Sequence, residues 1–108
     1  MNVGKLYKFN KYYWLLYPSK ETARVSFIAY PSATGTMVSS AEEVSDWVAY
    51  FNNKLNCNVS YVSPNSIFCF LEKEYEYCKL LTTNGELGWI IYPEDAEWTK
   101  DCIEEVTP

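Results

Sequence analysis

Hydrophobic and polar positions alternate along several short runs of this chain, and a period of two residues is typical of β-strands. The alternation occurs over residues 3–9 and 57–63, and it returns through residues 65–92. Two short turns divide residues 65–92, which predicts three consecutive antiparallel strands there. Residues 102–106, CIEEV, predict a last short strand. The pattern therefore predicts a mainly β fold with some helix.

The first turn within residues 65–92 is predicted at Lys73-Glu74. A turn centred there would place Cys69 opposite Cys78 on the neighbouring strand. Two buried thiols that act as small hydrophobic side chains are one interpretation of this pair. A redox-sensitive bond is the other, although no neighbouring residue in the sequence indicates a lowered thiol pKa.

The second turn contains Asn84-Gly85, a dipeptide typical of two-residue hairpin loops in which both residues have positive φ. This turn would pair Leu81 with Gly88. Pro93 then ends the third strand, because proline has no amide to donate to a strand ladder. Residues 94–100 predict a short helical turn before the last strand.

The clearest helix is predicted over residues 40–55. Ser40 and Glu43 have the spacing of a capping box, in which each side chain bonds the orphan backbone amide of the other residue. Apolar residues then recur at helical spacing: Val44, Trp47, Val48, Phe51 and Leu55. Asn56 marks the end of this helix, because asparagine tolerates the left-handed conformation.

The segment between the first strand and this helix is less regular. Residues 12–17, YYWLLY, predict either a second strand or a long loop arm. Ser19 is a candidate N-cap for a helix. Residues 25–30 fit the end of that helix or a strand equally well, because the run is short. Residues 31–39, PSATGTMVS, are typical of a loop.

Composition favours the same fold class. The chain has 108 residues, enough for one domain with a single core. Aromatic residues make up 18% of it, and aromatic side chains fit the pleated surface of a sheet. There is no histidine and the four cysteines lack the paired spacing of zinc sites, so neither a metal nor another cofactor is predicted.

The net charge is −5, with basic residues concentrated in residues 1–24 and acidic residues in residues 72–108. This acidity disfavours non-specific binding of nucleic acid, and ends of opposite charge favour intramolecular or head-to-tail attraction. The sequence has neither a signal peptide nor an apolar run long enough to span a membrane. We therefore expect a cytoplasmic protein with reduced thiols.

The string YCKLL at residues 77–81, followed by Asn84-Gly85 and then by Gly88-Trp89, resembles bacterial SH3 repeats. The resemblance covers residues 57–106 and extends to residues 3–9. It implies a five-stranded SH3-like barrel in which a helical turn precedes the last strand. LLYPSKETA and LLTTNGELGWI are also similar to segments of small proteins of cyanobacteria and their viruses.

The predicted helix lies in an insertion of about residues 19–56, where an SH3 domain has one loop. We expect residues 1–108 to form a single domain that includes this insertion. A helix added to a five-stranded small barrel also resembles the Sm-like fold. Sm-like proteins form rings by pairing edge strands between subunits, and they bind RNA. The Arg-Gly-Asn or Arg-Gly-Asp tripeptide of that family is absent from this sequence.

The SH3 resemblance implies a polyproline-binding groove lined by aromatic residues of the first loop and of the Gly-Trp strand. Six aromatic residues are candidates for this groove: Tyr12, Tyr13, Trp14, Tyr17, Trp89 and Tyr92. The alternative interpretation is that these rings pack in the core under the apolar stripe of the predicted helix.

A second candidate site lies in the N-terminal segment, where basic and aromatic residues are interleaved. Such a pattern can hold phosphates while nucleic-acid bases stack on the rings. The candidates are Lys5, Tyr7, Lys8 and Lys11, with the neighbouring rings of Phe9, Tyr12, Tyr13 and Trp14. The alternative is a first strand with core aromatic residues and solvated lysines.

Other chemistry is not predicted. The acidic residues Glu94, Asp95, Glu97 and Asp101 lack the glycine that calcium-binding loops use for their sharp turn, so a solvated acidic face is favoured. The sequence has no histidine, Ser-x-x-Lys motif or glycine-rich phosphate loop to support catalysis. We therefore expect that the protein is not an enzyme.

These features predict a non-enzymatic interaction or assembly module that binds a protein partner. Residues 3–9 and 102–106 are predicted to be open sheet edges, which invite strand pairing and formation of a homo-oligomer. The alternative function is an Sm-like ring that binds single-stranded RNA through the basic aromatic N-terminal segment.

Overall fold

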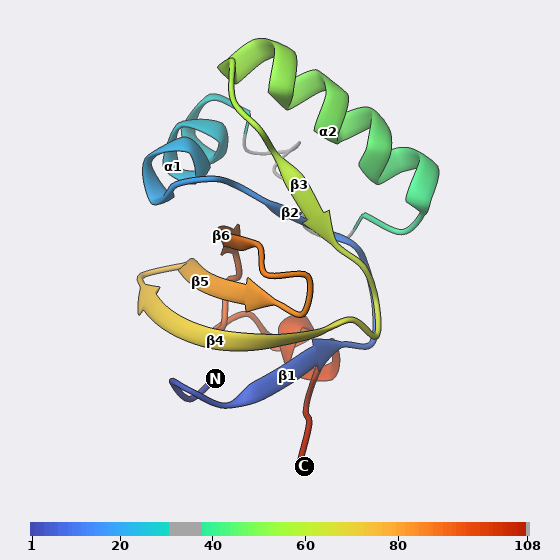
Figure 1. Cartoon of the computed structure of the whole chain (residues 1–108), viewed down its shortest axis with the longest axis vertical. Coiled ribbons are helices and arrows are strands. Elements are labelled where there is room, and N and C mark those ends of the chain that lie inside the picture. The colour runs from blue at the N-terminus through green and yellow to red at the C-terminus, as the bar shows by residue number, and fades with distance from the viewer. Residues whose placement is uncertain (31–37, 108) are drawn as a thin grey trace.

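The computed structural model describes residues 1–30 and 38–107 and shows an α+β fold of two antiparallel sheets and two α-helices (Figure 1). The strands are β1 (Leu6–Phe9), β2 (Trp14–Leu16), β3 (Ser60–Val62), β4 (Ile67–Glu74), β5 (Tyr77–Thr82), β6 (Leu87–Ile91) and β7 (Ile103–Glu105). The helices are α1 (Lys20–Ala29), α2 (Ala41–Leu55) and the 3-10 helix η2 (Glu97–Asp101). Of the loop predicted for residues 31–39, residues 31–37 lie outside the described residues.

The larger sheet has five strands in the order β6-β5-β4-β1-β7. Strand β1 is an interior strand, since Tyr7 pairs with Phe68 of β4 on one side and with Glu105 of β7 on the other. The prediction that residues 3–9 form an open edge is therefore wrong. The last strand, β7, pairs with β1 and covers that edge. Of the two edges that were expected to be open, β7 remains at the border of the sheet.

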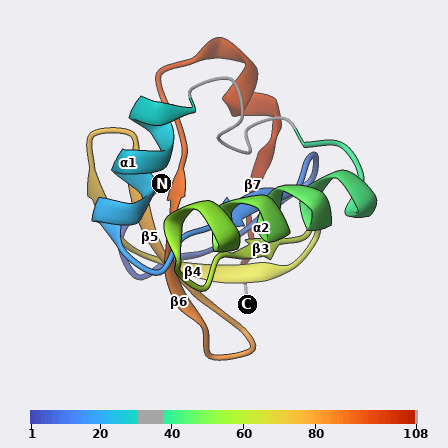
Figure 2. The ribbon, with the colours of Figure 1, turned by 90° about the horizontal axis from the view of Figure 1, so that it is seen from above.

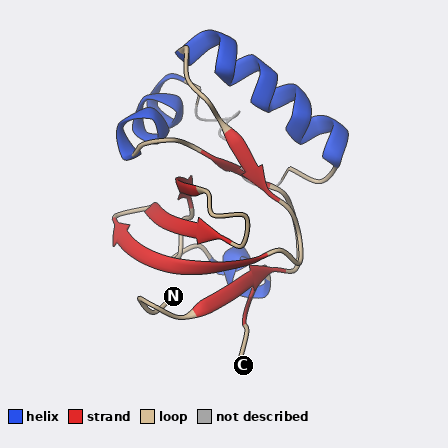
Figure 3. Ribbon diagram, viewed as in Figure 1, coloured by secondary structure: helices blue, strands red, loops and turns tan. Residues whose placement is uncertain are grey.

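The segment between β1 and β4 forms a second layer above this sheet. It contains the two-stranded sheet β2-β3 and both α-helices, which Figure 3 shows together on one side of the molecule. Seen from above, α2 crosses over β3 (Figure 2). Helix was predicted within about residues 19–56, and this segment contains α1 and α2, where the sequence clearly indicated one helix. We call the layer formed by the segment between β1 and β4 the inserted layer.

Both helices begin at the caps that the sequence predicts. The Ser19 hydroxyl accepts a hydrogen bond from the Thr22 amide at 3.1 Å, and the Ser40 hydroxyl accepts one from the Glu43 amide at 3.1 Å. Residues 25–30, which fitted either a helix or a strand, continue α1 as far as Ala29. Asn56 ends α2 in the left-handed conformation, with φ of 49°.

Two hydrophobic cores lie on opposite faces of β2. The first core consists of Tyr7, Phe9, Trp14, Leu16, Val62, Phe68, Phe70, Cys78, Leu80, Ile90, Tyr92 and Cys102. The second core consists of Leu15, Tyr17, Ala23, Val38, Val44, Phe51, Val59, Tyr77 and Ile91. Because successive strand residues face opposite sides, Trp14 and Leu16 enter the first core and Leu15 enters the second. The continuous apolar run YYWLLY is therefore a strand that is covered on both faces.

The β4–β5 hairpin has a different register from the predicted one. Its turn lies at Tyr75, which has a φ of 57°, and a bulge between Phe70 and Glu72 shifts the pairing. Cys69 consequently pairs with Leu81, and Cys78 pairs with Lys73. The prediction that the two cysteines lie opposite one another is wrong, and all four cysteines have free thiols.

The second hairpin also differs from prediction by one residue. Leu81 pairs with Leu87, because the Gly85 amide donates to the Thr82 carbonyl at 3.0 Å and makes a longer loop. Gly85 has a φ of 84°, whereas Asn84 is not among the residues with positive φ. The loop thus needs one left-handed residue, and glycine supplies it without steric cost.

None of the helices that the structure describes is both long enough and apolar enough to cross a membrane.

Candidate functional site

The Gly-Trp segment that carries the SH3 resemblance is the point where the inserted layer meets the five-stranded sheet. Trp89 and Tyr17 exchange two backbone hydrogen bonds, at 2.7 and 2.8 Å. A β-carbon at Gly88 would lie 2.5 Å from Leu16 Cγ and 2.9 Å from the Tyr17 carbonyl oxygen. Glycine is therefore required here for β2 to approach β6.

Three of the six aromatic residues assigned to that groove are core residues. Trp14, Tyr17 and Tyr92 are each at most 2% exposed. The Tyr17 hydroxyl lies 2.8 Å from the Ser26 hydroxyl, and the Tyr92 hydroxyl donates to the Thr99 carbonyl. Burial raises the pKa of both tyrosines to about 12. These rings hold the two layers together and do not form a surface.

The other three groove candidates are half-buried and contact different neighbours. Tyr12 meets Trp98 edge to face at 6.4 Å between ring centroids, and Tyr13 meets Tyr61 in the same way at 5.9 Å. Trp89 packs against the second core. The six aromatic residues therefore do not come together in one exposed groove.

The residues proposed for nucleic-acid contact lie just before β1, on both faces of β1 and in the loop after it. Tyr7 is buried, and its hydroxyl accepts a hydrogen bond from the Asn2 amide at 2.6 Å. Lys8 is half-buried on the opposite face of the strand, and Lys11 is exposed. Lys5 forms an ion pair with Glu105 at 3.4 Å. The ring of Tyr7 is thus unavailable for base stacking, and the three lysines do not form one basic face with it.

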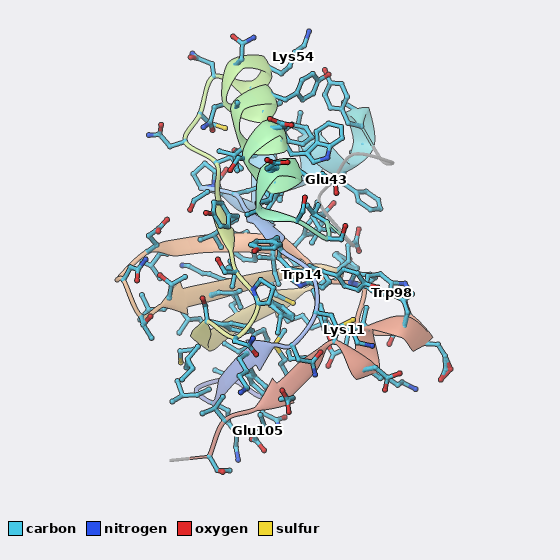
Figure 4. All side chains as sticks on the ribbon, turned by 90° about the vertical axis from the view of Figure 1, so that its right-hand side faces the viewer. Lys11, Trp14, Glu43, Lys54, Trp98 and Glu105 are labelled. Atoms are coloured by element: carbon cyan, nitrogen blue, oxygen red, sulfur yellow. The ribbon has the colours of Figure 1, made fainter. Side chains whose placement is uncertain are left out.

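Trp98 is a core-associated residue that the sequence did not single out. Its ring stacks on Trp14 at 6.1 Å with an interplanar angle of 11°, and Trp14 also stacks on Phe9 at 4.6 Å. Figure 4 shows Trp14 and Trp98 approaching one another from β2 and η2. Among the described residues the buried indole nitrogen of Trp14 has no hydrogen-bond partner. Unmet buried donors are costly, so the stabilisation of this ring comes from stacking and from packing in the first core.

Of the acidic residues Glu94, Asp95, Glu97 and Asp101, Glu94 and Glu97 form ion pairs. Glu94 binds Lys73 and also accepts from the α-amino group of Met1 at 2.6 Å. Hydrogen bonding to these two cations lowers the pKa of the Glu94 carboxyl. Glu97 pairs with Lys100 at 3.3 Å. Within residues 1–30 and 38–107, no three cysteine, aspartate or glutamate side chains gather closely enough to hold a metal ion.

The solvent-facing side of the five-stranded sheet carries an apolar row that crosses four adjacent strands. Leu6 of β1 pairs with Cys69 of β4, Cys69 pairs with Leu81 of β5, and Leu81 pairs with Leu87 of β6. Leu6, Leu81 and Leu87 are 38%, 36% and 57% exposed, and Cys69 is half-buried. We call these four residues the apolar row. Sequence reasoning missed it because both hairpin registers were misassigned.

Exposed leucines that stand singly are ordinary, whereas a contiguous apolar surface indicates a contact with another molecule. The apolar row is contiguous because each residue lies directly opposite the next in the sheet. Charged residues border it: Glu72 pairs with Lys79 on one side of the row. Lys8 pairs with Glu104 on the other side. An apolar centre with a charged rim is the usual anatomy of a protein interface.

No known protein family matches this chain, and neither do curated proteins or solved structures.

Proposed function

We propose that this protein is a non-enzymatic interaction module that self-associates through the apolar row. We also propose that its five-stranded sheet is an SH3-like barrel, modified by the inserted layer. Five strands with a helical turn before the last one support the barrel, since η2 separates β6 from β7. The apolar row is the observation that carries the functional proposal.

The partner on the apolar row is a second copy of this chain. Two-fold symmetric dimers bring the same patch of both subunits together, so the patch must complement itself. An axis that crosses the row between β4 and β5 places Leu6 against the partner's Leu87 and Cys69 against the partner's Leu81. The same axis places Glu72 against the partner's Lys79. The leucines of one row therefore contact the leucines of the partner's row, and Glu72 at the border lies opposite a positive charge of the partner.

Protein contact is better supported than the RNA-binding alternative. Base stacking needs exposed rings, but Tyr7 lies in the first core. Lys5 is also engaged with Glu105, so part of the basic charge is already neutralised.

Sedimentation equilibrium over a range of concentrations tests the proposal. We expect wild-type protein to form a dimer and Leu81→Lys to remain a monomer, because the charge would be buried at the centre of the contact. Val3→Lys is the matched control: Val3 is 70% exposed and lies outside the row, so this variant should dimerise normally. A wild-type protein that is monomeric at high micromolar concentration would overturn the proposal.

A further inference from the structure

Strand β7 presents backbone hydrogen-bonding groups on the free edge of the sheet. In the order of the described strands, β7 has a neighbour on one side only, β1. The Val106 amide donates to the Leu6 carbonyl at 2.9 Å, and the Asn10 amide donates to the Cys102 carbonyl at 2.8 Å. In an antiparallel ladder, alternate residues face the neighbour. The backbone groups of Ile103 and Glu105 therefore point away from β1 and can pair with an added strand.

A pocket lies beside this edge. It has a volume of about 330 Å³ and lies between the start of β1 and the end of β7. The residues that line it are Gly4, Lys5, Leu6, Glu105, Val106 and Thr107. Leu6 and Val106 make part of its wall apolar. The pocket lies at the seam between β1 and β7, so a side chain from an added strand would reach it by crossing over β7, and the pocket has room for one aliphatic side chain.

The charges of β7 select among the strands that it can pair with. A second copy of β7 that pairs antiparallel about Glu104 would place Glu104 opposite the partner's Glu104. Like charges directly opposite one another destabilise a strand pair. Acidic residues on an edge strand thus oppose self-pairing, as charged edges commonly do. Glu104 faces Lys8 of β1 on one side, and a strand with a basic residue opposite Glu104 on the free side would gain from the same charge.

We propose that β7 binds an extended basic segment of a partner protein by strand addition, with an aliphatic side chain of that segment in the pocket. Backbone hydrogen bonds supply affinity in this mode of recognition, and the pocket and the charges supply specificity. The inference deepens the proposed interaction role by naming a partner class. Its pocket shares Leu6 with the apolar row, whereas the backbone edge of β7 lies outside the row, so variants of the row on β5 and variants of β7 let the two proposals fail separately.

Fluorescence anisotropy with a labelled seven-residue peptide of alternating Lys and Val tests the inference. Wild-type protein should bind this peptide more tightly than the matched peptide of alternating Glu and Val. Glu105→Pro removes an amide that points away from β1, so it should weaken binding by roughly tenfold or more while the sheet remains intact. Glu105→Gln keeps that amide, and it should bind within about threefold of wild type if only the screened surface charge is lost.

Each arm of the experiment can overturn the inference. Equal affinity for the acidic peptide would exclude the charge preference. Equal binding by Glu105→Pro and Glu105→Gln, with unchanged circular dichroism, would exclude strand addition. The Leu81→Lys variant should bind the basic peptide as wild type does, because Leu81 lies on β5, which β4 and β1 separate from β7. Loss of peptide binding in Leu81→Lys would show that one surface serves both contacts.

Discussion

Gly88 faces Leu16 so closely that a β-carbon at Gly88 would lie 2.5 Å from Leu16 Cγ. This contact joins the inserted layer to the five-stranded sheet, next to the backbone pairing of Tyr17 with Trp89. Core packing tolerates little added volume, so the contact requires glycine at this position.

Gly88→Ala should lower the free energy of unfolding by about 1–3 kcal/mol, because Leu16 and the Tyr17 backbone must move. Gly4→Ala is the control, since a β-carbon at Gly4 would meet no atom within 4 Å. That control carries only the cost of placing alanine at a positive φ, roughly 1–2 kcal/mol. Urea denaturation measures both. A Gly88→Ala variant that is more stable than Gly4→Ala would contradict the close contact.

Trp14 offers a second stability test. Trp14→Ala should cost about 3–5 kcal/mol, as expected when a fully buried large ring is lost. Trp14→Phe should cost much less, because it keeps ring packing against Phe9 and removes a buried N–H that has no partner among the described residues. Thermal and urea unfolding report the difference. Equal losses for the two variants would show that the indole nitrogen makes a stabilising contact.

The ion pairs of Glu94 lead to the prediction that the stability of the protein depends on pH. Its folded-state pKa is lowered, chiefly by the hydrogen bond with Lys73. A lowered pKa gives stability that is present above the unfolded-state pKa and is lost as pH falls through the folded-state value. Glu94→Gln should therefore cost up to about 1 kcal/mol at neutral pH and nothing in strong acid.

The measurement for Glu94 is urea unfolding of both proteins across the acidic range. Asp46→Asn is the control, because Asp46 is exposed on α2, away from the apolar row, and forms no ion pair with the described residues. A Glu94→Gln cost that stays constant from neutral to acid pH would contradict the ion pairs.

The thiols should react in the order of their exposure. Cys57 and Cys69 are half-buried, whereas Cys78 and Cys102 are buried. Burial also raises the pKa of the Cys78 thiol to about 12, which suppresses the reactive thiolate. In a pulse of maleimide followed by peptide mass mapping, Cys69 should be labelled before Cys78. Labelling of both at one rate under native conditions would contradict the packing.

Local patterns in the sequence predicted the strands, the caps of both helices and the apolar stripe of α2. They succeeded because alternation, a serine before a helix and asparagine after one act over a few neighbouring residues. The end of α1 was ambiguous for the opposite reason. Its helical state depends on the burial of Ala23 and Ser26 against the rest of the fold, which is a tertiary contact.

The candidate surfaces could not be predicted from the sequence because they depend on register. Tyr75 takes a left-handed conformation that is uncommon for residues other than glycine or asparagine, and the bulge after Phe70 adds a residue. Together they place Leu81, instead of the predicted Cys78, opposite Cys69. The apolar row forms only in this register. Aromatic composition likewise could not distinguish a ligand groove from a hydrophobic core, because aromatic residues are common in both.

A disulfide between subunits tests the central claim, self-association through the apolar row, most directly. Leu6 and Leu87 lie on β1 and β6 with two strands between them, roughly 14 Å apart at the usual strand spacing. That separation is too great for a disulfide within one chain. In the proposed dimer, Leu6 of one subunit lies against the partner's Leu87. Leu6→Cys with Leu87→Cys, in a Cys69→Ser background, should give a covalent dimer on mild oxidation; a product that stays monomeric would contradict the account.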